Sequence, residues 1–296
     1  MNLDHLVAIA YFAGWKLVRA LPEKFSYACF ERIGTITLRR NAAPIRRLRS
    51  NLQRVCPEKD NAAMDQLMVE AVSSYMRYWC DTFRSPDWSK ERVNETVTVT
   101  REELLTEPMR DGRGVVITLP HAGNWDHAGS YFCGMGFPLV TVAERVKPEA
   151  LFNKFLEYRQ NMGMEVLALD GRSMGTLMQR ARDGALIALV ADRDLSRSGI
   201  DVDFFGHPAR MPAGPALLAV RTGIPLVTAF VSYTATGIHV EFNSVAIPTE
   251  GSESERIAQV VQSCANIFAQ GITKAPQDWH MLQRIWIDGD FQERSA

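Results

Sequence analysis

The sequence predicts an α/β protein with a mostly parallel central sheet flanked by helices, preceded by an N-terminal helical extension. From about residue 94 onward, short apolar runs alternate with helix-like stretches, which is typical of strands and helices that alternate along a parallel sheet. Before that point, apolar residues recur at near-helical spacing. Because no internal repeat or linker interrupts the chain, we expect two parts. Residues 1–90 form a membrane-facing helical extension, and residues 91–296 form one α/β unit.

The extension is expected to be helical. Its first segment has apolar residues at helical spacing from Leu3 to Val18, and Pro22 closes it. With Trp15 near the apolar side, this helix fits either a membrane interface or a position against the body of the protein. A further helix is expected at 62–83, where several aromatic residues that fit a core gather on one side.

The α/β part is expected to contain seven strands separated by helices. The strands are expected at 96–101, 114–120, 139–144, 165–170, 185–191, 224–232 and 239–245. The helices are expected at 124–133, 148–162, 174–183, 213–222 and 253–273. Strands this apolar are typical of a sheet that helices cover on both faces.

The net charge of -1 conceals a basic block, because seven arginines and no acid lie between residues 32 and 57. Such a block favours phosphates of a lipid surface or of nucleic acid, or it forms a solvated helix face. The block lacks the interleaved aromatics of nucleic-acid sites, so no nucleic-acid partner is expected. No apolar run reaches the roughly 18 residues that span a bilayer. We therefore expect peripheral contact with an anionic membrane surface.

Several kinds of site have no signal in this sequence. The glycine-rich loops of dinucleotide and nucleotide phosphate sites are missing. No set of His and Cys residues has metal-ligand spacing, so neither a metal nor a permanently bound cofactor is expected. The five cysteines are scattered, as in reduced thiols of a protein that faces the cytosol.

The leading candidate for chemistry is the segment LPHAGNWDHAG, at 119–129. His121 directly follows a predicted strand, and Asp126 follows five residues later at the start of a predicted helix. Residues just past the carboxyl ends of parallel strands line the ligand crevice. A histidine there is positioned to take a proton from a hydroxyl, and the acid can orient it or stabilise its charged form.

Two further segments lie at equivalent positions. VADRDLSRSG brings Asp192 to the end of another strand, from which a carboxylate can fix the tautomer of His121 across the crevice. Its alternative is a solvated charge cluster. MPAGP begins a helix at Gly214 whose free amides can face an anion, with Arg210 just before it. Its alternative is an ordinary junction between a loop and a helix.

A serine esterase is the rival hypothesis. The segment GRSMG matches G-x-S-x-G between a strand and a helix, which is the context of a nucleophile elbow around Ser173. Acids and histidines follow it in the order that such a triad requires. Arg172 is an awkward neighbour for that elbow, and no HGGG-type segment precedes it to supply an oxyanion hole.

The sequence resembles the lysophospholipid-acyltransferase-type superfamily, in the branch of the lipid A lauroyl and myristoyl acyltransferases. The blocks that carry the resemblance cover nearly the whole chain: YFAGWKLVRALP, YMRYW, PHAGNWD, TVAERVKPE, FLEYRQNMGMEVLAL, ADRDLSRSG, FFGHPARMPAGPALLAVRTGIPL and PQDWHMLQRIW. Within that branch, the sequence resembles the acyltransferases that act on phosphatidylinositol mannoside. The resemblance implies transfer of a palmitoyl-type chain from acyl-CoA to the 6-hydroxyl of mannose, at the cytoplasmic face of the plasma membrane. A lipid A-type or other glycolipid or lysophospholipid acceptor is the alternative.

The resemblance also implies roles for particular residues. His121 matches the catalytic histidine and Asp126 the acid of its motif, while Asp192 lies where the family has the carboxylate that bonds the histidine. Close relatives carry Glu at that last position, so the shorter Asp is a departure. Residues expected to contact substrates are Asn124, Glu144 and Arg159 on the acceptor side, and Arg193 and Arg210 for phosphates. The expected reaction is a direct transfer in a ternary complex, with His121 as general base.

Overall fold

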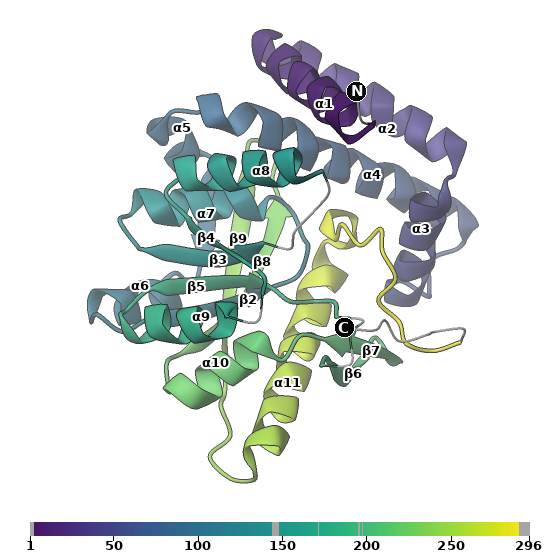
Figure 1. Ribbon diagram of the computed structural model, residues 1–296. Coiled ribbons are helices and arrows are strands. Elements are labelled where there is room, and N and C mark those ends of the chain that lie inside the picture. The colour runs from purple at the N-terminus through teal and green to yellow at the C-terminus, as the bar shows by residue number, and fades with distance from the viewer. Residues whose placement is uncertain (1–2, 144–147, 171, 195, 197, 290–296) are drawn as a thin grey trace.

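The computed structural model of this 296-residue chain describes residues 3–143, 148–170, 172–194, 196 and 198–289 (Figure 1). Its helices and strands confirm the predicted α/β class. The helices are α1 (Leu3–Ala20), α2 (Glu23–Arg40), α3 (Ala43–Val55), α4 (Asn61–Arg84), α5 (Lys90–Glu95), α6 (Glu103–Arg110), α7 (Trp125–Gly134), α8 (Glu149–Asn161), α9 (Ser173–Arg182), α10 (Gly214–Thr222) and α11 (Glu253–Lys274), with 3-10 turns η1 (Ser85–Asp87) and η2 (Pro276–Asp278). The strands are β1 (Val97–Thr100), β2 (Val115–Leu119), β3 (Leu139–Ala143), β4 (Glu165–Ala168), β5 (Leu186–Val190), β6 (Ile200–Phe204), β7 (His207–Met211), β8 (Leu226–Tyr233) and β9 (Ile238–Val245).

Seven strands form one sheet in the order β1-β9-β8-β2-β5-β3-β4. Every neighbouring pair is parallel except β8 and β9, which are antiparallel. All five residues of β2 are buried, as expected for a strand in the middle of a covered sheet. All seven predicted strands are therefore confirmed, together with the mostly parallel arrangement.

Helices cover both faces of the sheet, which explains why the strands are apolar throughout. Alternate residues of β2 point to opposite faces, so Val115 and Ile117 join the apolar cluster of α6 and α7, while Val116 joins that of α9, α10 and α11. The predicted helices between strands are confirmed, and α5 and α6 are additions that the sequence analysis missed.

The N-terminal helices pack on α4 rather than standing apart from the protein (Figure 1). Pro22 separates α1 from α2, as predicted. The indole of Trp15 is buried and donates a hydrogen bond to the Phe83 carbonyl oxygen at 2.9 Å. A continuous apolar cluster runs from Trp15 to Trp286. The boundary near residue 90 stays a prediction.

A small antiparallel hairpin, β6–β7, lies beside the main sheet in a region for which the sequence predicted no strand. Its turn residues Phe205 and Gly206 have φ of 53° and 73°. Two successive positive φ values are typical of the tight turns that match the twist of a hairpin. Asn or Asp usually precedes the glycine in such turns, and the bulky Phe205 hid this signal.

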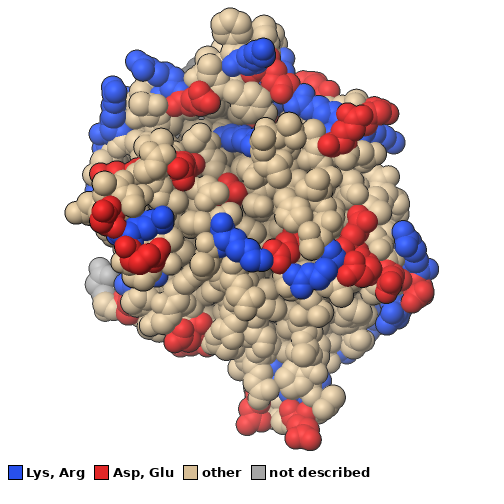
Figure 2. Space-filling view, turned by 180° about the vertical axis from the view of Figure 1, so that it is seen from behind, with Lys and Arg blue, Asp and Glu red and all other residues tan. Residues whose placement is uncertain are grey.

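Charged side chains of both signs are mixed over the surface, which explains the small net charge. Figure 2 shows Lys and Arg interspersed with Asp and Glu over the rear face, across its middle as well as around its margin. Within the basic block, Arg49 pairs with Asp65 and Arg54 with Asp288. The remaining members are exposed on α2 and α3: Arg32, Arg39, Arg40, Arg46 and Arg47.

Candidate active site

The central strands β2 and β5 end side by side and deliver two polar residues to one edge of the sheet. Leu119 is the register partner of Val190, so the two chains leave the sheet together. His121 and Asp192 each follow two residues later. Their proximity therefore results from strand order, since Asp192 lies 71 residues after His121 along the chain. The crevice outside the carboxyl ends of parallel strands is the usual ligand site of such sheets.

His121 and Asp192 form a hydrogen-bonded pair. The Nδ1 atom of His121 lies 2.6 Å from Oδ1 of Asp192, and its backbone amide donates to Oδ2 at 3.0 Å. Asp192 is fully buried, whereas the side chain of His121 is 38% exposed. Burial acts to raise the pKa of Asp192, but the charge of His121 and the hydrogen bonds to the carboxylate outweigh it, and the pKa lies below its usual range. The ionised Asp192 fixes the proton of neutral His121 on Nδ1 and leaves Nε2 as an acceptor.

A C-terminal segment holds this pair from the other side. The indole of Trp279 donates to Oδ2 of Asp192 at 2.9 Å. The amide of His280 donates to the carbonyl oxygen of His121 at 2.7 Å. The amide of Gly123 donates to the carbonyl oxygen of Asp278 at 2.9 Å. The segment thus runs antiparallel to the turn after β2, and its hydrogen bonds hold both His121 and Asp192 in place.

Gly123 is required for this arrangement. Its φ is +57°, and a Cβ there would lie 2.5 Å from the carbonyl oxygen of Val231. Any larger residue would push the turn away from β8 and displace His121. Gly123 of the PHAGNWD block therefore allows the turn after β2 to pack closely against the backbone of β8.

Asp126 does not serve as the hydrogen-bond partner of His121 among the described residues. Its carboxylate accepts from Nε of Arg159 at 2.8 Å and from the hydroxyl of Tyr78 at 3.3 Å. Burial acts to lower the pKa of Arg159, but the charge of Asp126 outweighs it and the pKa is raised. The side chain of Asp126 therefore points from the start of α7 towards α4 and α8, so it does not orient His121 through a hydrogen bond, and its predicted role in stabilising the charged ring stays a prediction.

Aromatic rings form the wall beside the exposed edge of the imidazole. Trp125 contacts His121 edge-on with ring centroids 5.7 Å apart, and it stacks on Tyr78 at 4.5 Å. Tyr78 in turn contacts Trp79 at 5.6 Å. Such a wall excludes water from one side of the base and suits an apolar substrate segment.

Asn124 caps helix α7. Its side-chain oxygen accepts from the amide of His127 at 2.9 Å, and its nitrogen donates to Asp81 at 3.4 Å. The residue is buried. Both ends of the amide are used inside the protein, so the expected contact with substrate is replaced by a helix cap that fixes the start of α7.

The other residues expected to contact substrate lie in different surroundings. Arg193 is half-buried next to Asp192, at the edge of the sheet. Arg210 lies on β7, where it pairs with Asp201 and donates to the carbonyl oxygen of Ser196 at 3.1 Å. These contacts neutralise its charge and brace the hairpin. Glu144 lies outside the described residues.

Ser173 lacks a histidine partner among the described residues. It begins helix α9, and its hydroxyl donates to the carbonyl oxygen of Asp170 at 2.8 Å. The side chain is used as a helix-start residue and is buried. The geometry therefore disfavours the nucleophile elbow that GRSMG suggested.

Sequence reasoning missed Trp279 as a neighbour of the site. The segment PQDWHMLQRIW contributed to the family resemblance, but its tryptophan carried no sign of a polar role. His280 next to it is buried, and its Nε2 lies 2.9 Å from the hydroxyl of Ser74. Burial lowers the pKa of His280 to about 3, so this ring stays neutral. Nothing in a single sequence links such a distant segment to the turn after β2.

Comparison with known proteins gives consistent matches. The profile of the family described as bacterial lipid A biosynthesis acyltransferase matches residues 1–287. The phosphatidylinositol mannoside acyltransferase of Mycolicibacterium smegmatis is 40% identical over 291 residues, which cover 97% of this chain and 94% of the relative. The protein of the same name from Mycobacterium tuberculosis H37Rv is 38% identical over 292 residues, covering 97% and 90%.

Proposed function

Because the chain belongs to the bacterial lipid A biosynthesis acyltransferase family, it is an acyltransferase, and we propose that it acylates phosphatidylinositol mannoside. The donor is a palmitoyl-type acyl-CoA, and the accepting group is the 6-hydroxyl of mannose. The name of the relatives supports the acceptor. The observation that carries the mechanism is the half-exposed imidazole of His121, bonded through Nδ1 to the buried carboxylate of Asp192.

His121 acts as the general base in this proposal. Its Nε2 takes the proton of the sugar hydroxyl while the oxygen attacks the thioester carbonyl carbon. The carbon–sulfur bond then breaks, and the leaving thiolate takes the proton back from the imidazolium. Asp192 stabilises the positive ring between these steps, and general-base help of this kind contributes about 10²–10⁴-fold in rate.

Backbone amides at the start of α10 are the favoured donors to the oxyanion. The amides of the turn after β2 are already engaged, since His121 donates to Asp192, Ala122 to the Pro120 carbonyl and Gly123 to the Asp278 carbonyl. Helix α10 runs back towards the start of β8, so its N-terminus at Gly214 lies at the same edge of the sheet as His121. Free amides at a helix start stabilise developing negative charge.

The enzyme acts as a peripheral protein on the cytoplasmic face of the plasma membrane. The described helices include none that is long and apolar enough to cross a bilayer. Exposed apolar side chains lie on α1 and on α2, which also carries the first arginines of the basic block: Leu17 on α1 and Phe25, Ile33 and Ile36 on α2. Each basic residue near an anionic surface contributes about 1 kcal/mol of attraction. Apolar and basic groups together suit an anionic lipid surface.

Two arginines support substrate contact in different ways. Arg193 directly follows Asp192 and is half-buried, and in this proposal its guanidinium binds a phosphate of the donor or acceptor. Arg159 is retained as an acceptor contact from the family resemblance, and its ion pair with Asp126 fixes the position of its guanidinium. Glu144 is retained as an acceptor contact from the family resemblance. Arg210 is not retained, because Asp201 neutralises it.

The test compares two single variants on the full chain. His121→Ala is expected to lower acyl transfer by about 10²–10⁴-fold, whereas Ser173→Ala leaves it largely intact. The assay is mass spectrometry of phosphatidylinositol mannoside incubated with palmitoyl-CoA, with a lipid A-type acceptor as the parallel substrate. Full activity of His121→Ala, or fluorophosphonate labelling of Ser173 with loss of activity in Ser173→Ala, would refute the mechanism.

A further inference from the structure

Trp279 has an extended backbone, with φ of -85° and ψ of 103°, and it pairs antiparallel with Ala122 in the turn after β2. Side chains of successive residues in an extended segment point to opposite sides. The indole of Trp279 reaches Asp192, so the side chains of Asp278 and His280 lie on the other side of the segment. There both of them meet helix α4.

One buried hydroxyl on α4 joins these two side chains. Oγ of Ser74 lies 2.7 Å from Oδ1 of Asp278 and 2.9 Å from Nε2 of His280. All three residues are buried. The amide of Tyr233 donates to Oδ2 of Asp278 at 2.8 Å, so β8 anchors the same carboxylate. Ser74 is therefore the residue through which α4 is cross-linked to the C-terminal segment.

The single proton of the Ser74 hydroxyl sets the direction of both hydrogen bonds. Burial raises the pKa of Asp278, while the hydrogen bonds that it accepts favour the ionised form. An ionised carboxylate only accepts, so Oγ donates to Asp278 and accepts from the Nε2 proton of His280. Nδ1 of His280 then carries no proton, and it is buried without a hydrogen-bond partner among the described groups. Because burial lowers the pKa of His280 to about 3, the ring stays neutral.

Each partner of Ser74 also holds the turn of His121 through its backbone. The amide of His280 donates to the carbonyl oxygen of His121 at 2.7 Å. The carbonyl oxygen of Asp278 accepts from the amide of Gly123 at 2.9 Å. A change at Ser74 is therefore expected to move two backbone groups that fix the position of the base.

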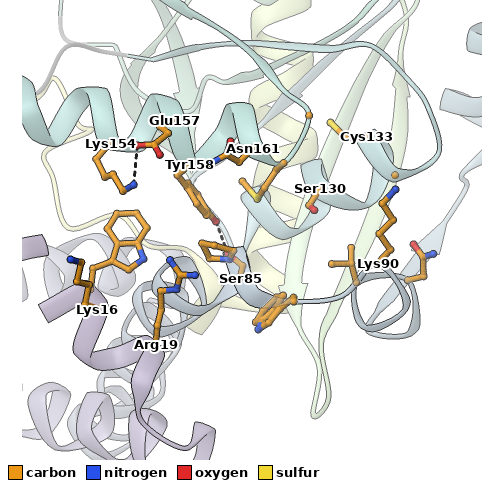
Figure 3. Close-up of a pocket in the computed structure, with 18 of the residues that line it drawn as sticks. Lys16, Arg19, Ser85, Lys90, Ser130, Cys133, Lys154, Glu157, Tyr158 and Asn161 are labelled. Carbon is orange, nitrogen blue, oxygen red and sulfur yellow. Dashed lines mark hydrogen bonds and ion pairs between the residues drawn. The ribbon is translucent and has the colours of Figure 1, made fainter. Parts of the chain in front are cut away.

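The large cavity between α1 and α8 plays no part in this arrangement. It has a volume of about 1090 Å³, and the hydroxyls of Ser85 and Tyr158, bonded to each other at 2.8 Å, belong to its wall (Figure 3). Neither Ser74 nor its two partners line it. Replacing Ser74 thus leaves the wall of that cavity unchanged, and ligand contact there does not explain an effect on turnover.

We propose that Ser74 is a positioning residue for His121, because its hydroxyl fixes the two residues whose backbones hold the turn of that histidine. The inference rests on the proposed role of His121 as general base. Loss of the hydroxyl leaves the Nε2 proton of His280 buried without an acceptor, which destabilises the segment as it stands. The imidazole then leaves the geometry in which it meets the sugar hydroxyl, and a misplacement of about 1 Å lowers a rate by up to about 10²-fold.

The test compares two buried serines, each replaced by alanine in the full chain. Ser26 is the matched control, because its hydroxyl also donates to one group, the Val18 carbonyl oxygen at 3.0 Å, and accepts from another, Nη1 of Arg84 at 3.1 Å. Ser74→Ala is expected to lower kcat for acyl transfer by about 10–100-fold with both KM values unchanged, since the substrate contacts are retained. Ser26→Ala is expected to keep the kcat of the unmodified chain.

A second variant and a spectroscopic signature complete the test. Ser74→Cys keeps the size of the side chain but is only a weak donor and acceptor, so it carries the comparison if Ser74→Ala fails to fold. The proton on Nδ1 of His121, in its hydrogen bond to Asp192, is followed by NMR and identified by its absence in His121→Gln. We expect this resonance to shift or broaden in the Ser74 variants and to stay unchanged in Ser26→Ala.

The outcomes separate the role of Ser74 from the proposed function. An unchanged His121 resonance in the folded Ser74 variants would overturn the proposal, and so would a loss of activity confined to KM. An equal loss of kcat in Ser26→Ala would reduce the effect to general destabilisation and overturn it as well. If the unmodified chain transfers no acyl group to phosphatidylinositol mannoside, the proposed function fails, and the His121 resonance alone decides whether Ser74 positions that ring.

Discussion

Two buried carboxylates near the start of α7, those of Asp192 and Asp126, bind different kinds of partner. Asp192 accepts hydrogen bonds from His121 and Trp279 and supports an imidazole that is partly exposed. Asp126 is 3% exposed and pairs with the guanidinium of Arg159, which is itself mostly buried. One carboxylate thus supports a group that faces the crevice, and the other supports a charge inside the protein. The acid closest to His121 in sequence is therefore not the acid that bonds it.

The two carboxylates differ because their side chains point in different directions, whatever their separation from His121 along the chain. Asp126 lies on α7, whose first turn faces α4 and α8, where Tyr78 and Arg159 are found. Asp192 leaves β5 beside β2, so its carboxylate meets the turn that carries His121. A His-x4-Asp pattern in sequence therefore combines a catalytic candidate with a structural ion pair.

The largest expected effect is a loss of acyl transfer when Asp192, but not Asp126, is replaced. Asp192→Asn removes the negative charge that stabilises the imidazolium and favours the wrong tautomer of His121. We expect acyl transfer to fall by about 10²–10⁴-fold while the fold is kept. The measurement is kcat for palmitoyl-CoA and phosphatidylinositol mannoside, with Asp126→Asn as the matched control. An Asp192→Asn enzyme with ordinary kcat would remove the carboxylate from the mechanism.

The next effect concerns stability at the other carboxylate. Asp126→Asn leaves Arg159 charged and buried without its counter-charge, which typically costs about 3–5 kcal/mol of unfolding free energy. Adding Arg159→Gln to Asp126→Asn removes that charge, so the double variant is expected to lose less than the sum of the singles. Urea unfolding of the four proteins gives the coupling free energy. Additive losses would contradict a direct ion pair.

The sequence was sufficient for most of the fold and for the pairing of His121 with Asp192, but not for the surroundings of that pair. Strands such as β2 and β5 are apolar along their whole length, so their positions and the residues that follow them were predictable. The hairpin at Phe205 was missed because its turn lacks the usual Asn or Asp. Trp279 was missed because its contact with Asp192 depends on how the C-terminal segment returns to the sheet. Long-range packing of this kind leaves no periodic signal in one sequence.

His127, unlike His121, has no carboxylate partner among the described residues, and it is expected to make stability depend on pH. His127 is buried, with its Nε2 3.1 Å from the hydroxyl of Thr96. Burial lowers the pKa of His127 to about 4. Below the unfolded value of about 6.5, the unfolded chain binds a proton that the folded chain does not, so stability falls as pH decreases from there towards 4.

His127→Gln is expected to flatten that dependence. The loss attributable to His127 reaches about 1.4 kcal/mol per pH unit once the unfolded state is fully protonated. Unfolding free energies of both proteins at several values between pH 7.5 and 5 provide the comparison. A wild-type stability that is unaffected by acid over this interval, or an equal slope in His127→Gln, would show that the ring is charged or exposed in the folded chain.

The smallest expected effect tests whether Trp279 acts on catalysis through Asp192. Trp279→Phe keeps a buried ring but removes the donor to Oδ2, and the lost hydrogen bond is worth about 1–3 kcal/mol. Trp286→Phe is the matched control, because that buried indole donates to Asn51 at 2.9 Å in the same C-terminal segment. Both variants are expected to lose stability, but only Trp279→Phe should lower kcat, by roughly tenfold with KM unchanged. Equal kcat in the two variants would mean that Trp279 holds the segment in place without influencing the carboxylate.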